Sequence, residues 1–475
     1  MPKYQRHRVD KDSDNTTNTN TEMKGIKKLS SVVLCASNPR SSSTFMSSSL
    51  SLQVPSLPLR TVACNTDADN ANDDTMHQTE ARHQEAEATK TPTTIDMPII
   101  GIGTYKFKKG SGDASIAIQE ALKLGYRQID TAFVYGGEQT EKEIGSALAA
   151  LLTSPSSLSS ASASSSSSAP IARSDIFLTS KQWRAYHGYE PTLQCLNKSL
   201  KRLQTDYLDL YLIHWPGPAY NTMARRKDLM EQSPDGPFVY AKDGHAPSQL
   251  QSLRAETWRA MEDSLYEGKC RAIGVSNFTI RHLEALKQTA RVWPPAVNQI
   301  ELHPYNPQKE LVAYCRTEGI VVQAYASLGG QDSGKKTWNI LGGRLMEREE
   351  VKGIAAKYGK TPAQVLLRWA TQQGFGVIPK STNVEHMRMN LEAVSVKVCD
   401  DFDVDSNSNA NVENDDEADR AVLSLSKEDM EILNGLDQSH IQSGDSDEDG
   451  AQRMRANEKA RLCWVRDPLK MLDFE

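Results

Sequence analysis

Short apolar runs alternate along the chain with longer stretches of helical periodicity. The runs are rich in β-branched residues, which favour strands, while the stretches between them repeat apolar residues every three or four positions, as amphipathic helices do. Eight runs are predicted to be strands, at residues 98–103, 127–131, 175–181, 207–214, 271–276, 296–301, 320–325 and 376–380. Helices are predicted at residues 114–124, 138–152, 189–203, 250–267, 279–289, 308–318 and 362–373.

Apolar strands that alternate with helices are typical of a parallel sheet buried on both faces. Eight such repeats predict an α/β fold in which the sheet closes into a (β/α)8 TIM barrel. The alternative is an open, doubly wound sheet that binds a dinucleotide at a glycine-rich turn after its first strand. Gly101 and Gly103 begin such a turn, but Lys106 stands where the third glycine is expected, so the barrel is favoured.

Three regions lack this alternation. Residues 1–90 are predicted to be a disordered extension, in which residues 23–65 are rich in Ser, basic and free of acidic residues. That composition fits an organelle transit peptide or an ordinary disordered tail. The protein is therefore expected in the cytoplasm, or in a plastid or mitochondrion if the segment is a transit peptide. Residues 153–169, mostly Ser, and the acidic residues 400–420 are predicted to be disordered insertions within one barrel domain, residues 91–475.

Charge and hydropathy narrow the classes of partner. The formal net charge is −6, whereas a nucleic-acid-binding protein usually carries a strongly basic face. No apolar run approaches the length of a membrane-spanning helix. The expected partner is therefore a small molecule rather than a nucleic acid or a membrane.

Four reactive residues stand at or just after the ends of consecutive predicted strands, where barrel enzymes carry their chemistry. Asp130 ends the second strand with Tyr135 five residues later, Lys181 ends the third, and His214 ends the fourth. Singly, each has an ordinary structural explanation, such as a helix cap, a surface charge or a core histidine. Together they predict a catalytic site.

Carbonyl reduction gives these residue types a joint task, because it needs a hydride at carbon and a proton at oxygen. A free tyrosine is a weak acid at neutral pH, and a nearby ammonium favours its phenolate form. We therefore expect Tyr135 to be the acid and Lys181 to lower its pKa. Asp130 would hold the lysine, and His214 would orient the carbonyl oxygen.

The motifs around these residues resemble those of the aldo-keto reductase superfamily. The match runs from about residue 97 to residue 394, resumes near residue 423, and includes residues 101–105, 125–132, 208–216, 273–278, 297–304 and 377–381. The chain looks most like the small-aldehyde and diketone reductases. The resemblance implies a monomeric, NADP-dependent oxidoreductase that reduces aldehydes or ketones to alcohols on a (β/α)8 barrel, without a metal ion. Its catalytic tetrad would be Asp130, Tyr135, Lys181 and His214.

The resemblance also implies how NADPH would bind across the barrel mouth. Ser276, Asn277 and Gln299 match partners of the nicotinamide carboxamide, and Tyr325 matches the aromatic that stacks on the nicotinamide ring. Further cofactor contacts are implied for Thr104, Ser327, Leu328, Lys380, Ser381, His386 and Asn390. The resemblance implies that the substrate pocket is lined by Tyr105, Trp183, Trp215 and Trp464. Trp464 lies in a C-terminal loop that would cover the substrate.

Cofactor choice depends on Lys380 and Ser381, which match the pair that holds the ribose phosphate of NADPH. The superfamily commonly has an arginine six residues after that lysine, where this chain has His386, and Met389 replaces an expected glutamate near the adenine. Histidine offers fewer donors than arginine and is mostly neutral at physiological pH. We expect NADPH to be preferred but bound more weakly, with Arg388 as a substitute for the missing arginine.

Two other functions remain alternatives. Some barrels of this superfamily bind the cofactor as catalytically weak regulatory or structural proteins, which the complete tetrad disfavours. A metal-dependent hydrolase would need clustered histidine and acidic ligands, for which only His214 and Asp130 are candidates. The substrate itself is not readable, because specificity depends on the loops at residues 217–253 and 329–345 and on the tail.

Overall fold

The fold is described from a computed structural model, which defines residues 45–47, 50–62, 92–152, 171–218, 248–330, 343–397 and 423–437. The two predicted insertions, at 153–169 and 400–420, and the tail with Trp464 lie outside the described residues. Within the described ranges, no helix combines the length and apolar character that crossing a membrane requires.

Eight parallel strands form one sheet that closes on itself. They are β5 (Ile102–Gly103), β6 (Gln128–Asp130), β7 (Phe177–Gln182), β8 (Leu210–Ile213), β9 (Ile273–Ser276), β10 (Val297–Glu301), β11 (Val321–Tyr325) and β12 (Gly376–Val377). Each strand pairs with its neighbours in sequence. A parallel bridge between Ile100 and Val377 joins the first strand to the last. The (β/α)8 barrel predicted from the sequence is confirmed, and all eight predicted strands occur.

The seam between the first and last strands needs a glycine. The amide of Gly103 donates to the carbonyl oxygen of Pro379 at 3.0 Å. A Cβ added at Gly103 would lie 2.4 Å from the carbonyl oxygen of Ile378, which is closer than any side chain tolerates. Gly103 therefore closes the barrel, rather than starting a dinucleotide-binding turn.

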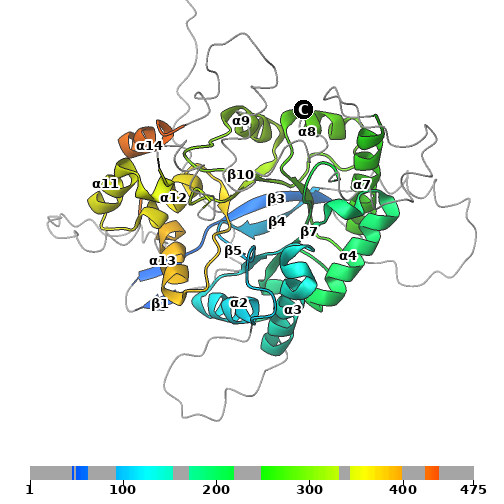
Figure 1. Cartoon of the computed structure of the whole chain (residues 1–475), viewed down its shortest axis with the longest axis horizontal. Helices are drawn as coiled ribbons and strands as arrows, with labels where there is room; N and C mark the ends of the chain where they lie inside the picture. Colours follow the sequence, from blue (N-terminus) through cyan, green and yellow to red (C-terminus); the bar gives the residue numbers. More distant parts are fainter. Residues whose placement is uncertain are drawn as a thin grey trace, which may run out of the picture. The chain divides into compact units, whose positions relative to one another are not determined.

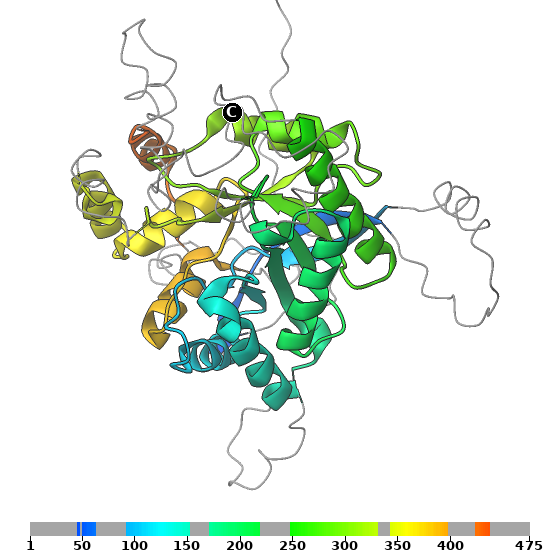
Figure 2. The ribbon, with the colours of Figure 1, turned by 45° about the vertical axis from the view of Figure 1, so that its right-hand side comes forward.

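Helices lie around the strands (Figures 1 and 2). They are α2 (Asp113–Leu124), α3 (Gln139–Leu152), α4 (Tyr189–Leu203), α7 (Ser248–Tyr266), α8 (Ile280–Lys287), α9 (Lys309–Glu318), α11 (Glu349–Lys357), α12 (Pro362–Thr371), α13 (Val384–Val394) and α14 (Lys427–Asn434). The predicted helices are confirmed with small shifts at their ends. α11, α13 and α14 are additional to the prediction.

Local sequence accounts for these helices. The buried positions of α4 recur every three or four residues, which places one buried, mainly apolar stripe against the barrel: Thr192, Cys195, Leu196, Ser199, Leu200 and Leu203. α12 begins at Thr361, whose hydroxyl accepts from the amide of Gln364 at 3.3 Å, and Pro362 occupies its first turn. Periodicity and capping thus agree along the same segments.

An antiparallel pair, β3 (Ser56–Val62) and β4 (Pro92–Pro98), covers the amino-terminal end of the barrel. Leu59 and Met97 are completely buried there. They pack with Phe177, Leu210 and Val297, the first residues of β7, β8 and β10. The hairpin is therefore the apolar floor of the barrel.

Within residues 1–90, which were predicted to be a disordered extension, residues 45–47, 50–53 and 56–62 form strands. Within β3, the half-buried or buried Leu57, Leu59 and Thr61 alternate with the exposed Ser56, Pro58 and Arg60, which is the period of a strand. β2 (Leu50–Gln53) pairs with β1 (Phe45–Ser47) on one side and with β13 (Val396–Lys397) on the other. The alternation is short and lies next to a Ser-rich stretch, so it gives a weak strand signal. The pairing of β3 with β4 forms only in the folded chain.

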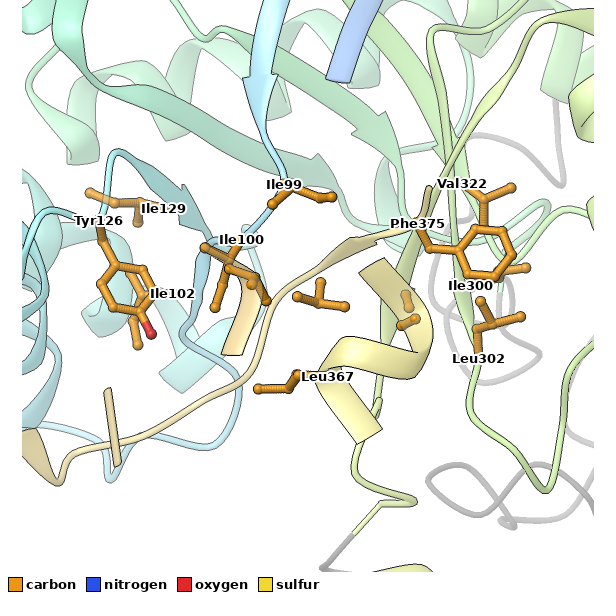
Figure 3. Close-up of a cluster of buried hydrophobic side chains, with 14 of the residues drawn as sticks. Ile99, Ile100, Ile102, Tyr126, Ile129, Ile300, Leu302, Val322, Leu367 and Phe375 are labelled. Atoms are coloured by element: carbon orange, nitrogen blue, oxygen red, sulfur yellow. The ribbon is translucent and has the colours of Figure 1, made fainter. Parts of the chain in front are cut away.

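The main core lies between the strands and the helices. Figure 3 shows Ile102, Tyr126 and Ile129 on one side of this region and Phe375, Ile300, Leu302 and Val322 on the other. The hydroxyl of the buried Tyr126 donates to the carbonyl oxygen of Met387 at 2.9 Å, which joins the segment before β6 to α13. This core fixes the strand ends that carry the polar residues described below.

Candidate active site

Four side chains meet at the carboxyl end of the barrel. Asp130 is the last residue of β6, Lys181 lies near the end of β7, and His214 directly follows β8. Tyr135 begins the 3-10 turn η1 (Tyr135–Glu138), which follows β6. All four are buried. The structure brings together the four residues that the sequence analysis singled out as a tetrad.

A buried ion pair joins Lys181 to Asp130. Lys181 Nζ donates to Asp130 Oδ1 at 2.6 Å and to the carbonyl oxygen of Thr131 at 2.9 Å. Asp130 Oδ2 accepts from Gln299 Nε2 at 2.8 Å. Burial lowers the pKa of Lys181 below its ordinary value, and the charges of Asp130 and Glu141 raise it again in part. The pair is satisfied by hydrogen bonds on both sides, as burial of two charges requires.

Tyr135 lies against this ion pair and against His214. Lys181 Nζ is 5.1 Å from the centroid of the Tyr135 ring. The ring centroids of Tyr135 and His214 are 5.8 Å apart at an interplanar angle of 76°, and the Tyr105 ring lies 5.1 Å away on another side. Gly136, with φ 57°, turns the chain sharply after the tyrosine. The phenol is therefore next to an ammonium and an imidazole.

The pKa of Tyr135 is shifted upward, opposite to the direction expected from the nearby Lys181. Burial raises the pKa of Tyr135 well above its ordinary value, and the charge of Asp130 and the neighbouring Tyr105 raise it further. The Lys181 ammonium, which is paired with Asp130, does not outweigh the desolvation of the phenolate. Tyr135 is thus held as a phenol that carries its proton.

His214 is held as a neutral imidazole. Burial, and then the charges of Lys181 and Arg184, lower the pKa of His214 well below its ordinary value. Its Nδ1 is buried and has no hydrogen-bond partner among the described residues. Its carbonyl oxygen accepts from Asn277 Nδ2 at 2.9 Å, which fixes the main chain. A neutral imidazole can donate one N–H to a carbonyl oxygen.

Ser276, Asn277, Gln299 and Tyr325 form a second polar group beside the tetrad. The Ser276 hydroxyl donates to the carbonyl oxygen of Gln299 at 2.8 Å, and the Tyr325 hydroxyl donates to Asn277 Oδ1 at 2.7 Å. Asn277 adopts a left-handed backbone with φ 63°. Such backbone costs free energy and concentrates at functional sites. Ser276 and Tyr325 end β9 and β11, and Asn277 follows β9, while Gln299 lies within β10 and reaches Asp130.

Lys380, Ser381 and His386 lie around the start of α13. Lys380 is exposed, with its Nζ 5.5 Å from the centroid of the Phe107 ring. Ser381 is buried, and its hydroxyl donates to the carbonyl oxygen of Asn383, the N-cap of α13, at 3.2 Å. His386 is exposed in the first turn of α13, and Asn390 is buried one turn later.

The expectation that Arg388 substitutes for the missing arginine is not supported by its contacts. Its Nε donates to Glu385 Oε2 at 2.9 Å, and its guanidinium also pairs with Glu392. Both carboxylates lie on α13 itself, at helical spacing, and the three side chains form an exposed network. Arg388 is therefore neutralised along the surface of its own helix.

The remaining predicted pocket residues surround the tetrad. The Thr104 hydroxyl donates to the carbonyl oxygen of Asp130 at 2.9 Å. The half-buried Trp183 and the buried Trp215 have ring centroids 5.8 and 6.4 Å from that of His214. Ser327 and Leu328 follow β11, where the Ser327 hydroxyl donates to the carbonyl oxygen of Ala324 at 3.3 Å. Trp464 lies outside the described residues.

Sequence reasoning missed three polar residues that hydrogen-bond to the main chain of residues 215–217. His187 Nε2 lies 3.1 Å from the carbonyl oxygen of Trp215, Arg254 Nε donates to that of Pro216 at 2.8 Å, and Arg184 Nε donates to that of Gly217 at 3.2 Å. Burial, with the charges of Arg254 and Arg184, lowers the pKa of His187 to about 3, so it is neutral. His187, Arg184 and Arg254 contact a segment that is distant from them in sequence, so no local sequence pattern predicts these contacts.

Comparison with known proteins relates this site to a family. Residues 99–409 match the model of the Aldo/keto reductase family. An aldo/keto reductase of Synechocystis is 37% identical over 304 residues, which cover 64% of this chain and 83% of that protein. The glyoxal reductase of Bacillus subtilis is 36% identical over 306 residues, which cover 64% of this chain and 86% of that protein.

A solved structure extends the similarity to the fold. An aldo-keto reductase from a Medee basin deep-sea metagenome library aligns with a TM-score of 0.51 and 32% sequence identity. The alignment covers 72% of this chain and 93% of that protein. The similarity therefore spans nearly the whole length of that protein.

Proposed function

Because the chain belongs to the aldo/keto reductase family, we propose that it reduces small aldehydes or ketones with NADPH, and that Tyr135 donates the proton. Family membership establishes an oxidoreductase that acts on small carbonyl compounds. The cofactor, the proton donor and the aldehyde reductase activity are the proposed parts. The observation that carries them is the position of the buried Tyr135 between the Lys181–Asp130 ion pair and His214.

The residues at the barrel mouth fit a nicotinamide dinucleotide. Gln299 Oε1 makes no hydrogen bond to the described part of the chain, while the Gln299 amide nitrogen is fully used, so an acceptor is left for a carboxamide N–H. Ser276 and Asn277 would hold the same carboxamide, and the ring of Tyr325, fixed by its hydroxyl, would stack on the nicotinamide. When bound, the cofactor supplies the hydride.

The other end of the cofactor would lie near α13. Lys380 offers an exposed ammonium, and Ser381 offers a hydroxyl beside the amino-terminal end of this helix. An ammonium and a helix amino terminus both favour a phosphate group. These groups support a preference for NADPH over NADH. His386 and Asn390 are the further candidates on the same helix.

The chain's own residues would orient the carbonyl group of the substrate and supply the proton that its oxygen takes up. The N–H of His214 would hold the carbonyl oxygen against the Tyr135 hydroxyl. As the carbonyl carbon gains the hydride, its oxygen gains the pair of electrons of the C=O π bond. That oxygen takes the proton of Tyr135, whose O–H bond breaks, and the product is an alcohol. The phenolate that remains is stabilised by the Lys181 ammonium, and burial excludes water from the exchange.

The substrates proposed are small aldehydes and dicarbonyls. The name of the similar protein from Bacillus subtilis, a glyoxal reductase, supports this class. The test is to mix the purified full chain with NADPH and then with a panel of short aldehydes, dicarbonyls and keto-sugars, and to follow nucleotide absorbance. Substrate-dependent oxidation of NADPH supports the proposal. Tight NADPH binding without turnover of any member of the panel would favour a regulatory role instead.

A further inference from the structure

Gln323 is a polar residue in the middle of the otherwise apolar strand β11, and the catalytic scheme above does not use it. It is completely buried, and it lies opposite Gln299 in the register of β10 and β11. Its Oε1 accepts from Gln299 Nε2 at 2.7 Å. A buried amide in a barrel interior is costly unless it is hydrogen-bonded, and the bond to Gln299 offsets part of this cost. The presence of a glutamine at this apolar position needs an explanation.

The chemistry of Asp130 fixes which way Gln299 points. An ionised carboxylate accepts hydrogen bonds and donates none, so the NH2 group of Gln299, and not its oxygen, must face Asp130. One of its two hydrogens goes to Asp130 Oδ2 at 2.8 Å, and the other goes to Gln323 Oε1 at 2.7 Å. Both donors are used, and Oε1 of Gln299 is left as the acceptor on the other side of the amide.

Gln323 is itself held from the barrel floor. Its Nε2 lies 3.7 Å from Met97 Sδ, on β4. Gly376 lies opposite Gln323 in β12, where an added Cβ would lie 3.4 Å from both Gln323 Cγ and Met97 Cε. Gly376 therefore lies next to both side chains. A continuous series of contacts thus runs from the floor hairpin through Gln323 and Gln299 to Asp130.

We propose that Gln323 is a positioning residue that sets the orientation of Gln299, so that Gln299 presents its oxygen to the nicotinamide carboxamide while its nitrogen remains on Asp130. The proposal rests on the proposed function. Without the acceptor of Gln323, one hydrogen of the Gln299 amide has no partner, and the amide gains alternative rotamers. The cofactor then binds a site that is correctly oriented only part of the time, which weakens binding at the nicotinamide end alone.

The test replaces Gln323 by methionine, which has a similar length and no strong hydrogen-bonding group. The matched control is Gln128→Met, because Gln128 is also completely buried in a strand of the barrel, and neither polar atom of its side chain has a hydrogen-bond partner among the described residues. Binding of NADPH and NADH is followed by quenching of tryptophan fluorescence. Adenosine 2′,5′-bisphosphate, which lacks the nicotinamide, reports on the phosphate end separately.

Gln323→Met is expected to weaken the binding of NADPH and the binding of NADH by the same factor, about fivefold. This factor is the scale of one neutral hydrogen bond. Binding of adenosine 2′,5′-bisphosphate stays unchanged, which a general loss of structure would not allow. Gln128→Met leaves all three affinities at the wild-type value. Gln323→Glu, which keeps an oxygen at the same position, restores cofactor affinity toward wild type.

Two results would overturn the proposal: wild-type NADPH affinity in Gln323→Met, or equal weakening of NADPH and the bisphosphate. If Gln323→Met does not fold, Gln323→Asn replaces it. Its shorter side chain keeps the polarity but withdraws the oxygen from Gln299, and the same pattern of affinities is expected. Failure of the wild-type chain to turn over any carbonyl would contradict the proposed function, whereas these binding measurements do not depend on turnover.

Discussion

Tyr135 and His214 carry opposite pKa shifts that have the same main cause. Burial penalises the phenolate of Tyr135 and the imidazolium of His214, so the pKa of the first rises and that of the second falls. Both side chains are therefore neutral and carry a proton that can be donated. The Lys181–Asp130 pair lies beside them and carries the only charges of the tetrad. At this scale the site is arranged to give up a proton rather than to accept one.

The pH dependence of reduction follows from these directions. The phenol form of Tyr135 is present below its raised pKa and is lost only as the pH rises through it. The neutral form of His214 is present above its lowered pKa and is lost only as the pH falls through it. The hydride-transfer rate is expected to be flat from about pH 6 to about pH 9, measured in single turnovers with bound NADPH. A sigmoidal loss centred near neutral pH would contradict these assignments.

Lys380 and Arg388 make a matched pair of exposed cations on which the cofactor preference can be tested. Lys380→Met removes the proposed contact to the ribose phosphate, so NADPH affinity should fall by about tenfold or more, while NADH affinity hardly changes. Arg388→Gln should leave both affinities unchanged, because Glu385 and Glu392 already occupy the guanidinium. The dissociation constants can be measured by fluorescence titration. A larger effect at Arg388 than at Lys380 would reverse the assignment of the phosphate site.

At the scale of elements, the barrel strands and most of the helices were predictable, whereas the floor strands and α13 were not. The stripe of α4 is readable because it repeats the helical period, and the eight strands are readable because each is a short apolar run bounded by helical stretches. The floor strand β3 is readable only with its partner β4, which lies far along the chain. α13 begins at an asparagine cap, yet its exposed first turn gives little apolar signal. Pairing and burial, which decide such segments, are properties of the folded chain.

The floor hairpin should contribute to stability, although it lies at the end of the barrel opposite the tetrad. Leu59→Ala removes a completely buried side chain from the cluster with Phe177 and Leu210, and it should lower the free energy of unfolding by about 2–4 kcal/mol. Ser56→Ala, on the exposed side of the same strand, should change it by less than about 0.5 kcal/mol. Denaturant unfolding of the two variants measures this difference. Equal stability of both variants would mean that β3 is not part of the folded barrel.

At the scale of the whole molecule, the closed barrel explains how distant residues form one site. Asp130, Lys181 and His214 stand at or just after the ends of three neighbouring strands, and their common position follows from the parallel order of the sheet, while Gln299 reaches Asp130 from within β10. The sequence therefore sufficed to predict which residues meet. It did not predict the net effect of burial on Tyr135, nor the hydrogen bond between Gln299 and Gln323, because both depend on packing in three dimensions.

The most direct test of the central claim is a single-turnover measurement on Tyr135→Phe. The wild-type chain and the variant are each loaded with NADPH and mixed with an aldehyde that the wild type reduces, and the loss of the reduced nucleotide is followed. The account predicts an unchanged NADPH dissociation constant in the variant and a hydride-transfer rate that falls by about a hundredfold or more, as for loss of a general acid. Hydride transfer at the wild-type rate in Tyr135→Phe would contradict the role of Tyr135 as the proton donor.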